Sequence, residues 1–374
     1  MSKKILFVLG TRPEAVKTAP LINTFKKSDN FITKVCITGQ HKEMTDNILN
    51  FFGITPDYNL NLMTKGQTLF DITVKALTGT GNIIDITQPD LIFVQGDTTS
   101  VFAASLAAFY KNVKTAHIEA GLRTGNKYFP FPEEINRILT GHIADFHFAP
   151  TPKAKENLKA EGIEKNVFVT GNSVIDALFE ALKIIKETKE DIFFDKFKYL
   201  NFDKKIILLT AHRRENFGEP FENICKAVKN IAENNDVQII YPVHPNPNIK
   251  NTAYKLLSDT ENIFLVEPLP YPELVWLMDK SYLVLTDSGG IQEEAPSLGK
   301  PVLVLRNETE RTEGVEAGTV KLTGTNTELI IKETSNLLND KVSYKNMKQK
   351  INPYGNGTTS QQILDIITKN INEI

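Results

Sequence analysis

Several short loops of the chain combine charged side chains with glycine in patterns that could bind an anion. In GTRPEAVK (10–17), Gly10 allows a sharp turn, Pro13 suits the first position of a helix, and Arg12 and Lys17 bring two cations to that helix N-terminus. Such a site attracts an anion, most naturally a phosphate. The alternative is that Arg12 pairs with a structural carboxylate, and this loop alone leaves both interpretations open. Neither the GxGxxG dinucleotide fingerprint nor the P-loop motif is present.

Carboxylates occur in three further loops of the first half: Asp97 in GDTTS (96–100), Glu119 in EAGLR (119–123), and Glu133 and Glu134 in PFPEE (130–134). Asp97 could instead cap the helix expected from residue 99, and Glu133 or Glu134 could complement a helix dipole. Three loops that bring carboxylates to one sheet edge nevertheless favour acid/base chemistry, which needs proton donors and acceptors on opposite faces of a substrate.

Histidines follow predicted strands at three places, namely His117, His212 in TAHRREN (210–216) and His244 in YPVHPNPN (241–248). A histidine at such a position is more often structural, but its titration near neutral pH makes it a candidate for proton transfer. His142 and His147 are expected to be structural. No histidine pair has metal-ligand spacing with a third partner, so we predict no metal.

The loop DSGGIQEEAP (287–296) has the most specific pattern in the second half. The backbone N–H groups of Ser288, Gly289 and Gly290 can approach a diphosphate, and the following helix dipole adds to the attraction. Glu294, about one turn into that helix, could accept hydrogen bonds from both hydroxyls of a ribose. Arg306 and Arg311 bring cations to the same edge. These residues predict a nucleoside diphosphate ligand with a further group attached.

The elements that must position these loops are short apolar strands that alternate with amphipathic helices, the pattern of an α/β protein with parallel sheets. In the first half we expect strands at 4–9, 33–38, 90–95, 113–118, 145–149 and 166–170, with helices at 14–27, 41–52, 68–86, 99–110, 133–143, 152–161 and 173–187. After an interdomain region at 172–203, strands follow at 205–210, 237–243, 262–266, 282–286, 301–305 and 319–322, with helices at 219–234, 250–258, 271–279, 291–298 and 326–338. A final helix, capped by Thr359 or Ser360, carries an apolar stripe.

Composition narrows the class of protein. The 374 residues include 43 Lys+Arg and 45 Asp+Glu, a net charge of −2, which does not favour nucleic-acid binding. The apolar run Ile5–Leu9 is too short for a signal peptide or membrane span, and we therefore expect no membrane association and a cytoplasmic location. Cys36 and Cys225 have no CxxC spacing and are expected in the core rather than in a disulfide or zinc site.

Taken together, eight motifs resemble the non-hydrolysing UDP-N-acetylglucosamine 2-epimerase family: GTRPEAVK (10–17), TGQH (38–41), GDTTS (96–100), HIEAGLRTG (117–125), PFPEEINR (130–137), TAHRREN (210–216), YPVHPNPN (241–248) and DSGGIQEEAP (287–296). The resemblance implies a GT-B fold, with two Rossmann-like doubly wound domains and an interdomain active-site cleft. The last helix would return to the first domain. We therefore expect domains at 1–171 plus 358–374 and at 172–357, with the boundary within 172–203.

The resemblance also implies a function. The family interconverts UDP-GlcNAc and UDP-ManNAc by elimination of UDP to a 2-acetamidoglucal and re-addition, needs no cofactor, acts as a cytoplasmic homodimer, and supplies ManNAc units for surface polysaccharides. By position, Asp97, Glu119 and Glu133 would be catalytic, with His212 near the diphosphate or leaving group. The UDP-binding residues would be Arg12, Lys17, His212, Ser288, Gly289, Gly290, Glu294 and Arg311.

Three positions depart from the family pattern. Thr312 stands where the family usually has Pro, which affects the loop around Arg311. Some members bind a second UDP-GlcNAc as an activator through a Gln and an Arg, where this chain has Glu43 and Gly66. We therefore do not expect that activation to carry over.

Other functions compatible with these loops are a hydrolysing epimerase, which would release ManNAc and UDP, or an enzyme for another UDP-2-acetamido sugar. A glycosyltransferase of similar fold would not turn over UDP-GlcNAc alone. A non-catalytic sugar-nucleotide sensor would tolerate loss of Asp97, Glu119 and Glu133, all of which are present.

Overall fold

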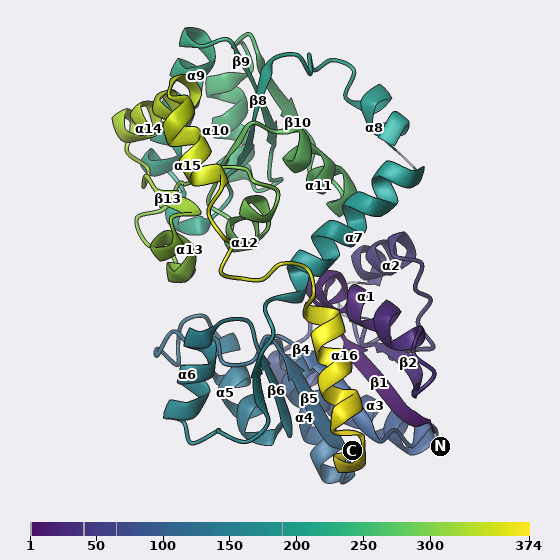
Figure 1. Cartoon of the computed structure of the whole chain (residues 1–374). Coiled ribbons are helices and arrows are strands. Elements are labelled where there is room, and N and C mark those ends of the chain that lie inside the picture. Colours follow the sequence, from purple (N-terminus) through teal and green to yellow (C-terminus); the bar gives the residue numbers. More distant parts are fainter. Residues whose placement is uncertain (1, 40–41, 65, 189) are drawn as a thin grey trace. The chain divides into compact units, whose positions relative to one another are not determined.

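The computed structural model describes residues 2–39, 42–64, 66–188 and 190–374 (Figure 1). The chain forms two compact units, unit 1 (Met1–Phe179 with Tyr354–Ile374) and unit 2 (Glu180–Pro353). The division falls within helix α7 (Ser173–Thr188), inside the predicted interdomain region, and the chain returns to unit 1 at Tyr354 rather than at residue 358.

Unit 1 contains a seven-stranded parallel sheet in the order β3-β2-β1-β4-β5-β6-β7. Its strands are β1 (Lys3–Leu9), β2 (Phe31–Ile37), β3 (Tyr58–Asn59), β4 (Leu91–Gln95), β5 (Lys114–Ile118), β6 (Phe146–Ala149) and β7 (Val167–Val169). The central strands are runs of buried residues because helices cover both faces of a parallel sheet.

The helices of unit 1 are α1 (Arg12–Lys26), α2 (Lys42–Phe51), α3 (Leu69–Thr87), α4 (Thr99–Tyr110), α5 (Glu133–Ile143), α6 (Pro152–Ala160), the first part of α7, and α16 (Thr359–Lys369). An aromatic cluster joins α1 to the sheet, in which Phe7 and Phe93 stack with ring centroids 4.8 Å apart and Phe25 meets Phe93 edge-on at 5.1 Å. The final helix α16 packs against α1, so the C-terminal segment is part of this unit.

Unit 2 contains a six-stranded parallel sheet in the order β10-β9-β8-β11-β12-β13. Its strands are β8 (Lys205–Thr210), β9 (Val237–Pro242), β10 (Ile263–Val266), β11 (Leu283–Thr286), β12 (Val302–Val304) and β13 (Val320–Leu322). The helices are α8 (Glu190–Lys196), α9 (Glu219–Asn234), α10 (Pro247–Leu257), α11 (Tyr271–Lys280), α12 (Gly289–Ser297), α13 (Thr312–Ala317), α14 (Thr327–Asn339) and α15 (Lys341–Lys348), with 3-10 turns η1 (Arg214–Asn216) in this unit and η2 (Ile371–Glu373) in unit 1.

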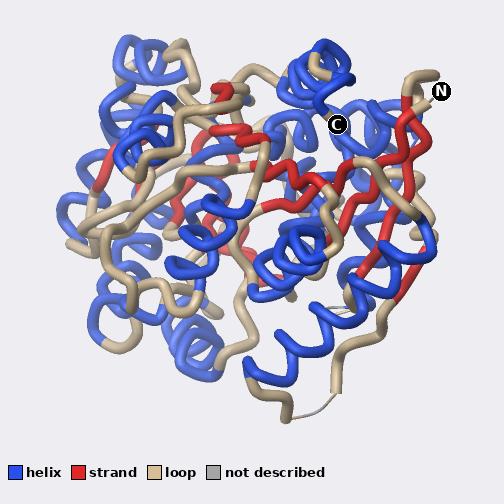
Figure 2. The backbone as a smooth tube through the Cα atoms, turned by 90° about the horizontal axis from the view of Figure 1, so that it is seen from below, coloured by secondary structure: helices blue, strands red, loops and turns tan. Residues whose placement is uncertain are grey.

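Both sheets are doubly wound, which confirms the predicted α/β class with two Rossmann-like sheets (Figure 2). The strand order reverses between β1 and β4 in unit 1 and between β8 and β11 in unit 2. Ligands of open α/β sheets bind at the carboxyl ends of strands at such a switch point. Among the described residues, no helix has the length and apolar character needed to cross a membrane.

Four elements were not predicted. Helix α8 lies in the charged segment 187–204, but Phe193, Phe194 and Phe197 pack around Trp276 of α11 at centroid distances of 5.1 to 5.8 Å. These aromatic contacts, rather than a helical stripe, order the segment. The others are β3, which has two residues, α13, which has six, and α15, which buries no residue, so none has a pattern that a sequence window detects.

Candidate functional site

In unit 1 the loop that follows β1 packs closely against the loop that follows β2 and against the first turn of α4, at the carboxyl edge of the sheet. Gly10 makes this packing possible, because a Cβ atom there would lie 2.7 Å from Thr38 Oγ1 and 3.2 Å from Ser100 Cβ. The backbone of Gly10 has no positive φ angle. The predicted turn at Gly10 therefore does not depend on a left-handed backbone, and close approach of the neighbouring segments is what requires a glycine here.

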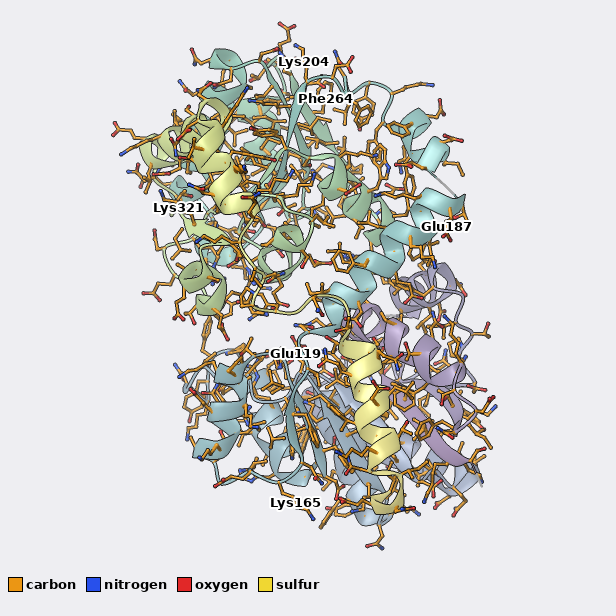
Figure 3. All side chains as sticks on the ribbon, in the orientation of Figure 1. Glu119, Lys165, Glu187, Lys204, Phe264 and Lys321 are labelled. Carbon is orange, nitrogen blue, oxygen red and sulfur yellow. The ribbon has the colours of Figure 1, made fainter. Side chains whose placement is uncertain are left out.

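Glu119, which is labelled in Figure 3, follows β5 at this edge. Several partners hold its side chain. Lys17 Nζ lies 2.6 Å from Oε1 and 2.7 Å from Oε2 of Glu119. Gln95 Nε2 donates to Oε2, and Asn172 Nδ2 donates to Oε1 at 3.1 Å. The residue also adopts a φ angle of +64°, a conformation that non-glycine residues keep only where their surroundings enforce it. The Glu119 carboxylate is therefore a buried group in an enforced geometry.

Asp97 follows β4 and pairs with Arg137, whose Nη2 donates to Asp97 Oδ2. The N-cap of α4 is Thr98, whose side chain accepts from Val101 N at 3.3 Å, so the alternative role of Asp97 as the helix cap is wrong. The Asp97 backbone carbonyl accepts from Asn136 Nδ2 at 3.0 Å. Its carboxylate therefore points to a guanidinium group and not back to its own helix.

The two carboxylates at the start of α5 differ. Glu134 is buried and accepts from the backbone N–H groups of Thr124 at 2.9 Å and Gly125 at 3.0 Å, and Arg137 Nη1 lies 3.1 Å from it. These contacts give Glu134 the task of holding a loop. Glu133 is half-buried, and its side chain makes no hydrogen bond or ion pair within the described residues. Glu133 is thus the carboxylate of this pair that is available to a ligand.

The loop after β1 contains a buried carboxyl that the sequence did not single out. Glu14 accepts from Gly10 N at 2.6 Å and from Thr11 Oγ1 at 2.8 Å. Burial raises the pKa of Glu14 to about 7, although these hydrogen bonds oppose the shift. These hydrogen bonds from Gly10 and Thr11 to Glu14 therefore stabilise the loop that carries Arg12.

The two cations of this loop have different surroundings. Arg12 is half-buried and pairs with no carboxylate in the part of the chain that the structure describes, which removes support for its alternative structural role. Lys17, which is predicted to bind a phosphate, contacts Glu119. Arg12 is thus the cation of this loop without an ion pair.

Among the described histidines of unit 1, His117 and His147 are buried and His142 is exposed. His117 lies within β5, so the prediction that it follows a strand is wrong. Its Nε2 lies 2.7 Å from the carbonyl of Gly96, and burial lowers the pKa of His117 to about 4. A histidine that stays neutral at physiological pH at this position supports the turn before Asp97. Burial likewise lowers the pKa of His147 to about 4, and His142 is exposed in the last turn of α5.

In unit 2, Asp287 organises the edge of the sheet. Its Oδ2 accepts from the backbone N–H groups of His212 and Arg213 at 2.8 Å each and from Asn216 Nδ2 at 3.1 Å. Its Oδ1 lies 3.6 Å from His212 Nδ1. The His212 ring stacks on His244 with centroids 5.5 Å apart. Burial lowers the pKa of His212, and the Asp287 charge opposes that shift.

In the loop DSGGIQEEAP (287–296), only some of the backbone N–H groups of Ser288, Gly289 and Gly290 are available to an anion. Ser288 precedes the first turn of α12, and its N–H already donates to Thr286 Oγ1 at 2.9 Å. The expectation that this N–H reaches a diphosphate is therefore not met by the observed geometry. Gly289 and Gly290 begin the helix, where N–H groups have no intrahelical acceptor. A Cβ atom on Gly289 would lie 3.0 Å from Glu310 Oε1, so a side chain there would be crowded.

The charged residues beside this loop balance one another. Glu294 is buried in α12 and accepts from Tyr271 Oη at 3.3 Å, while its neighbour Glu293 accepts from Arg311 Nε. Glu310 contacts Arg306 Nη1 at 2.7 Å. Burial raises the pKa of Glu310, but the cations of Arg311 and Arg306 outweigh it and hold the pKa at about 2. This edge therefore presents two arginines whose charge is partly neutralised by the protein.

Sequence reasoning missed five residues that the structure brings into these two sites: Glu14, Gln95, Arg137, Asn172 and Asp287. Arg137 and Asp287 lay at the ends of motifs already noted, which was the available signal. Gln95 and Asn172 gave none, because a buried amide at a strand end has no characteristic spacing. Among the described residues, no group of three His, Cys, Asp or Glu side chains is arranged to hold a metal ion.

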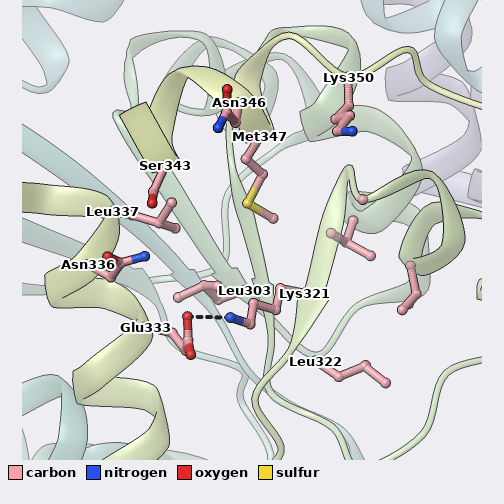
Figure 4. Close-up of a pocket in the computed structure, with 13 residues that line it drawn as sticks. Leu303, Lys321, Leu322, Glu333, Asn336, Leu337, Ser343, Asn346, Met347 and Lys350 are labelled. Carbon is pink, nitrogen blue, oxygen red and sulfur yellow. Dashed lines mark hydrogen bonds and ion pairs between the residues drawn. The ribbon is translucent and has the colours of Figure 1, made fainter. Parts of the chain in front are cut away.

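A separate cavity of about 570 Å³ lies in unit 2 (Figure 4). It is lined by residues of β13, α14 and α15, and the ion pair between Lys321 and Glu333 at 2.6 Å lies within it. None of the predicted site residues lines this cavity.

Two positions of unit 1 correspond to the activator-binding residues of some family members. The side chain of Glu43, like all of Gln40 and His41 of TGQH, lies outside the described residues. Gly66 has a φ angle of +80°.

This chain is similar to known proteins over nearly its whole length. The family model described as UDP-N-acetylglucosamine 2-epimerase matches residues 23–368. The UDP-N-acetylglucosamine 2-epimerase of Salmonella typhimurium is 50% identical over 97% of this chain and 98% of its own. The crystal structure of the Neisseria meningitidis UDP-GlcNAc 2-epimerase bound to UDP-GlcNAc is similar with a TM-score of 0.90 and 47% identity, covering 98% of this chain and 100% of that chain.

A third similar structure is that of Staphylococcus aureus MnaA with UDP, with a TM-score of 0.86, 46% identity, and coverage of 100% of this chain and 98% of that chain. Similarity over almost the whole length confirms the predicted GT-B-like fold. Because the family model and the Salmonella typhimurium relative both match nearly the entire sequence, this chain belongs to the UDP-N-acetylglucosamine 2-epimerase family.

Proposed function

We propose that the protein is a non-hydrolysing UDP-GlcNAc 2-epimerase, an isomerase that interconverts UDP-GlcNAc and UDP-ManNAc. The observation that carries the proposal is the set of three carboxylates at the unit 1 edge: Glu119 held by Lys17, Asp97 held by Arg137, and half-buried Glu133. Inversion at C2 of an acetamido sugar requires proton removal on one face and proton delivery on the other, which carboxylic groups can perform.

In the proposed reaction, a carboxylate removes the C2 proton, and the C2–H electrons form a C1–C2 double bond while the C1–O bond to UDP breaks. The products of this half-reaction are 2-acetamidoglucal and UDP, both retained. In the second half, a UDP oxygen bonds to C1 and a carboxylic acid delivers a proton to the opposite face of C2. The proposed reaction needs no electron acceptor.

Unit 2 would bind the UDP portion. The N–H groups of Gly289 and Gly290 and the guanidinium of Arg311 suit a diphosphate, and Glu294 suits the ribose hydroxyls. His212, oriented by Asp287, would stabilise charge on the departing diphosphate. Ser288 would contribute its hydroxyl rather than its engaged N–H. Arg12 and Lys17 of unit 1 would add positive charge, with Lys17 shared between the substrate and Glu119.

We further propose a homodimeric, cytoplasmic enzyme that supplies ManNAc units for surface polysaccharide, with units 1 and 2 as its two domains. Support for these finer points comes from the family resemblance, and the division at Phe179 and Pro353 supports the domain assignment.

Proton NMR of UDP-GlcNAc with the enzyme in deuterated water, without added cofactor, tests the reaction directly. We expect UDP-ManNAc with deuterium at C2, which reports epimerisation and proton exchange together. Release of free ManNAc and UDP would instead identify a hydrolysing epimerase. If UDP-GlcNAc remains unchanged, the proposed function is wrong, and a different sugar nucleotide or a transferase reaction would be the next hypothesis.

A further inference from the structure

Asn172 lies between β7 and α7 in unit 1, is buried, and has both ends of its side chain engaged. Its Oδ1 accepts from Val174 N at 3.1 Å, which satisfies an N–H group in the first turn of α7. Its Nδ2 donates to Glu119 Oε1 at 3.1 Å. Because the backbone N–H of Val174 can only donate, the amide orientation is determined, and its NH2 group must face Glu119.

The backbone around Asn172 is also the place where the two segments that link the units meet. The N–H of Asn172 donates to the carbonyl of Tyr354 at 2.7 Å, and Tyr354 is the first residue of the segment that returns to unit 1. Helix α7, which leads into unit 2, begins directly after Asn172. Gly171 has a φ angle of +87°, and a Cβ atom there would lie 2.9 Å from Thr359 Oγ1.

A second contact strengthens this junction. The carboxylate of Asp176, in the first turn of α7, accepts from the N–H groups of Thr359 at 3.2 Å and Ser360 at 2.7 Å. It therefore caps the N-terminus of α16, a role that was expected of Thr359 or Ser360 themselves. The start of α7, which leads out of unit 1, is thus joined by hydrogen bonds to the segment that returns to unit 1. One bond runs from Asn172 to Tyr354, and the others run from Thr359 and Ser360 to Asp176.

We propose that Asn172 is a positioning residue for Glu119, anchored at the point where the chain leaves and re-enters unit 1. Glu119 has a strained backbone conformation, so its carboxylate keeps one orientation only while its partners hold it. Lys17 contacts both of its oxygens and Gln95 contacts Oε2, whereas the Asn172 amide contacts Oε1. The inference rests on the proposed function, because the orientation of Glu119 has a consequence for rate only if Glu119 transfers a proton.

The substitution Asn172→Asp tests this inference with little change in shape. An aspartate retains an oxygen for Val174 N–H and leaves the backbone N–H to Tyr354 unchanged. It replaces the donor facing Glu119 with a carboxylate oxygen, which disfavours the ionised form of Glu119. We expect kcat to fall by about 10- to 100-fold, the scale of a misplaced catalytic group, with KM changed by less than about threefold. The acidic limb of the pH profile of kcat should move to higher pH.

Asn326→Asp is a matched control. Asn326 caps α14 through its side chain, which accepts from Leu329 N at 2.9 Å, and it is exposed in unit 2 outside the proposed site. The same change of amide to carboxylate there should leave kcat and the pH profile as in the wild type.

Asn172→Ser provides a second variant if Asn172→Asp does not fold. A serine hydroxyl can still cap α7 but does not reach Glu119, so kcat should fall without a large change in KM. Wild-type kcat in either folded variant would overturn the inference. A lowered kcat in Asn172→Asp with an unshifted acidic limb would also overturn it, because it would show a structural role only. Wild-type enzyme that does not turn over UDP-GlcNAc would contradict the proposed function instead, so the two failures are distinct.

Discussion

The two sheets of this protein have the same strand order apart from the additional edge strand β7 of unit 1, but they differ in what holds the acidic residue after the strand at the switch point. In unit 1 the carboxylate of Asp97 is held by the side chain of Arg137, whereas in unit 2 the carboxylate of Asp287 is held by the backbone N–H groups of His212 and Arg213. A side-chain partner leaves carboxylate surface toward a ligand, and Asp97 keeps a 27% exposed side chain. Backbone partners enclose the carboxylate, and Asp287 is 0% exposed. The same position is therefore the one proposed to serve chemistry in unit 1, whereas in unit 2 it supports the loop architecture.

The carboxyl edges of the two sheets also differ in which carboxylates their lysine and arginine side chains contact. In unit 1, Lys17 contacts Glu119, the carboxylate that is proposed to react. In unit 2, Arg306 and Arg311 contact Glu310 and Glu293, which have no proposed role in proton transfer. Loss of a carboxylate should therefore affect turnover in unit 1, and binding or stability in unit 2.

The largest expected effect is on turnover, in unit 1. Asp97→Asn and Glu119→Gln should each lower kcat by at least about 100-fold, because each removes a group that accepts or donates a proton. UDP binding, measured by calorimetry, should change little. Asp85→Asn, the same change at an exposed residue of unit 1 that pairs with Lys111, is the control and should keep full activity. Wild-type rates in both site variants would refute the assignment of unit 1 as the chemical half.

In unit 2, Glu294→Ala should weaken binding of UDP by about 10- to 100-fold, the equivalent of losing charged hydrogen bonds to a ribose. Turnover at saturating substrate should persist because the ribose is remote from C2. Tyr271→Phe removes only the hydroxyl that contacts Glu294 and should have a smaller effect. The exposed Glu328 of α14 provides a control as Glu328→Ala. Complete loss of turnover in Glu294→Ala at saturation would contradict the proposed division of labour.

Stability should distinguish Asp287 from Asp97. Asp287→Ala leaves the N–H groups of His212 and Arg213 without their acceptor, which we expect to lower the free energy of unfolding by about 1–3 kcal/mol. Asp287→Asn keeps an oxygen for these groups and should lose less. Denaturant unfolding of both variants, with Asp97→Asn for comparison, measures the difference. Equal free energies of unfolding for Asp287→Ala and wild type would show that the hydrogen bonds from His212 and Arg213 to Asp287 do not contribute to stability.

The last expected effect is a pH dependence of stability from Glu14 in unit 1. Its pKa is raised by burial from 4.5 to about 7, so between these values the folded state binds more protons than the unfolded state. Stability from this group is therefore complete below about pH 4.5 and declines as the pH rises toward 7. Glu14→Gln stays neutral at all pH values. The Tm of this variant minus the Tm of the wild type should therefore be higher at pH 8 than at pH 5. A difference in Tm that is independent of pH would contradict the assigned state of Glu14.

Much of the fold was predictable because its signals are local. The apolar runs of β8 and the helical periods of α4, α5 and α9 were predicted to the residue. Helix α8 was not, because its order depends on Trp276, about 80 positions away in the chain. The cap of α16 was assigned to the wrong residue for the same reason, since Asp176 lies 184 positions from Ser360. Local patterns report periodicity and turn chemistry but not a partner from a distant segment.

The candidate site divides in the same way. Residue type and position after a strand, both local properties, sufficed to single out Asp97, Glu119, Glu133, Gly289, Gly290 and Glu294. Which groups these residues contact was decided only by the tertiary structure: Lys17 for Glu119, Arg137 for Asp97, and a neighbouring hydroxyl for the N–H of Ser288. The physical reason is that a hydrogen bond depends on distances of a few ångströms between atoms that the chain itself separates widely. Sequence alone therefore proposed which residues at each edge could take part in chemistry, and folding determined which groups those residues contact.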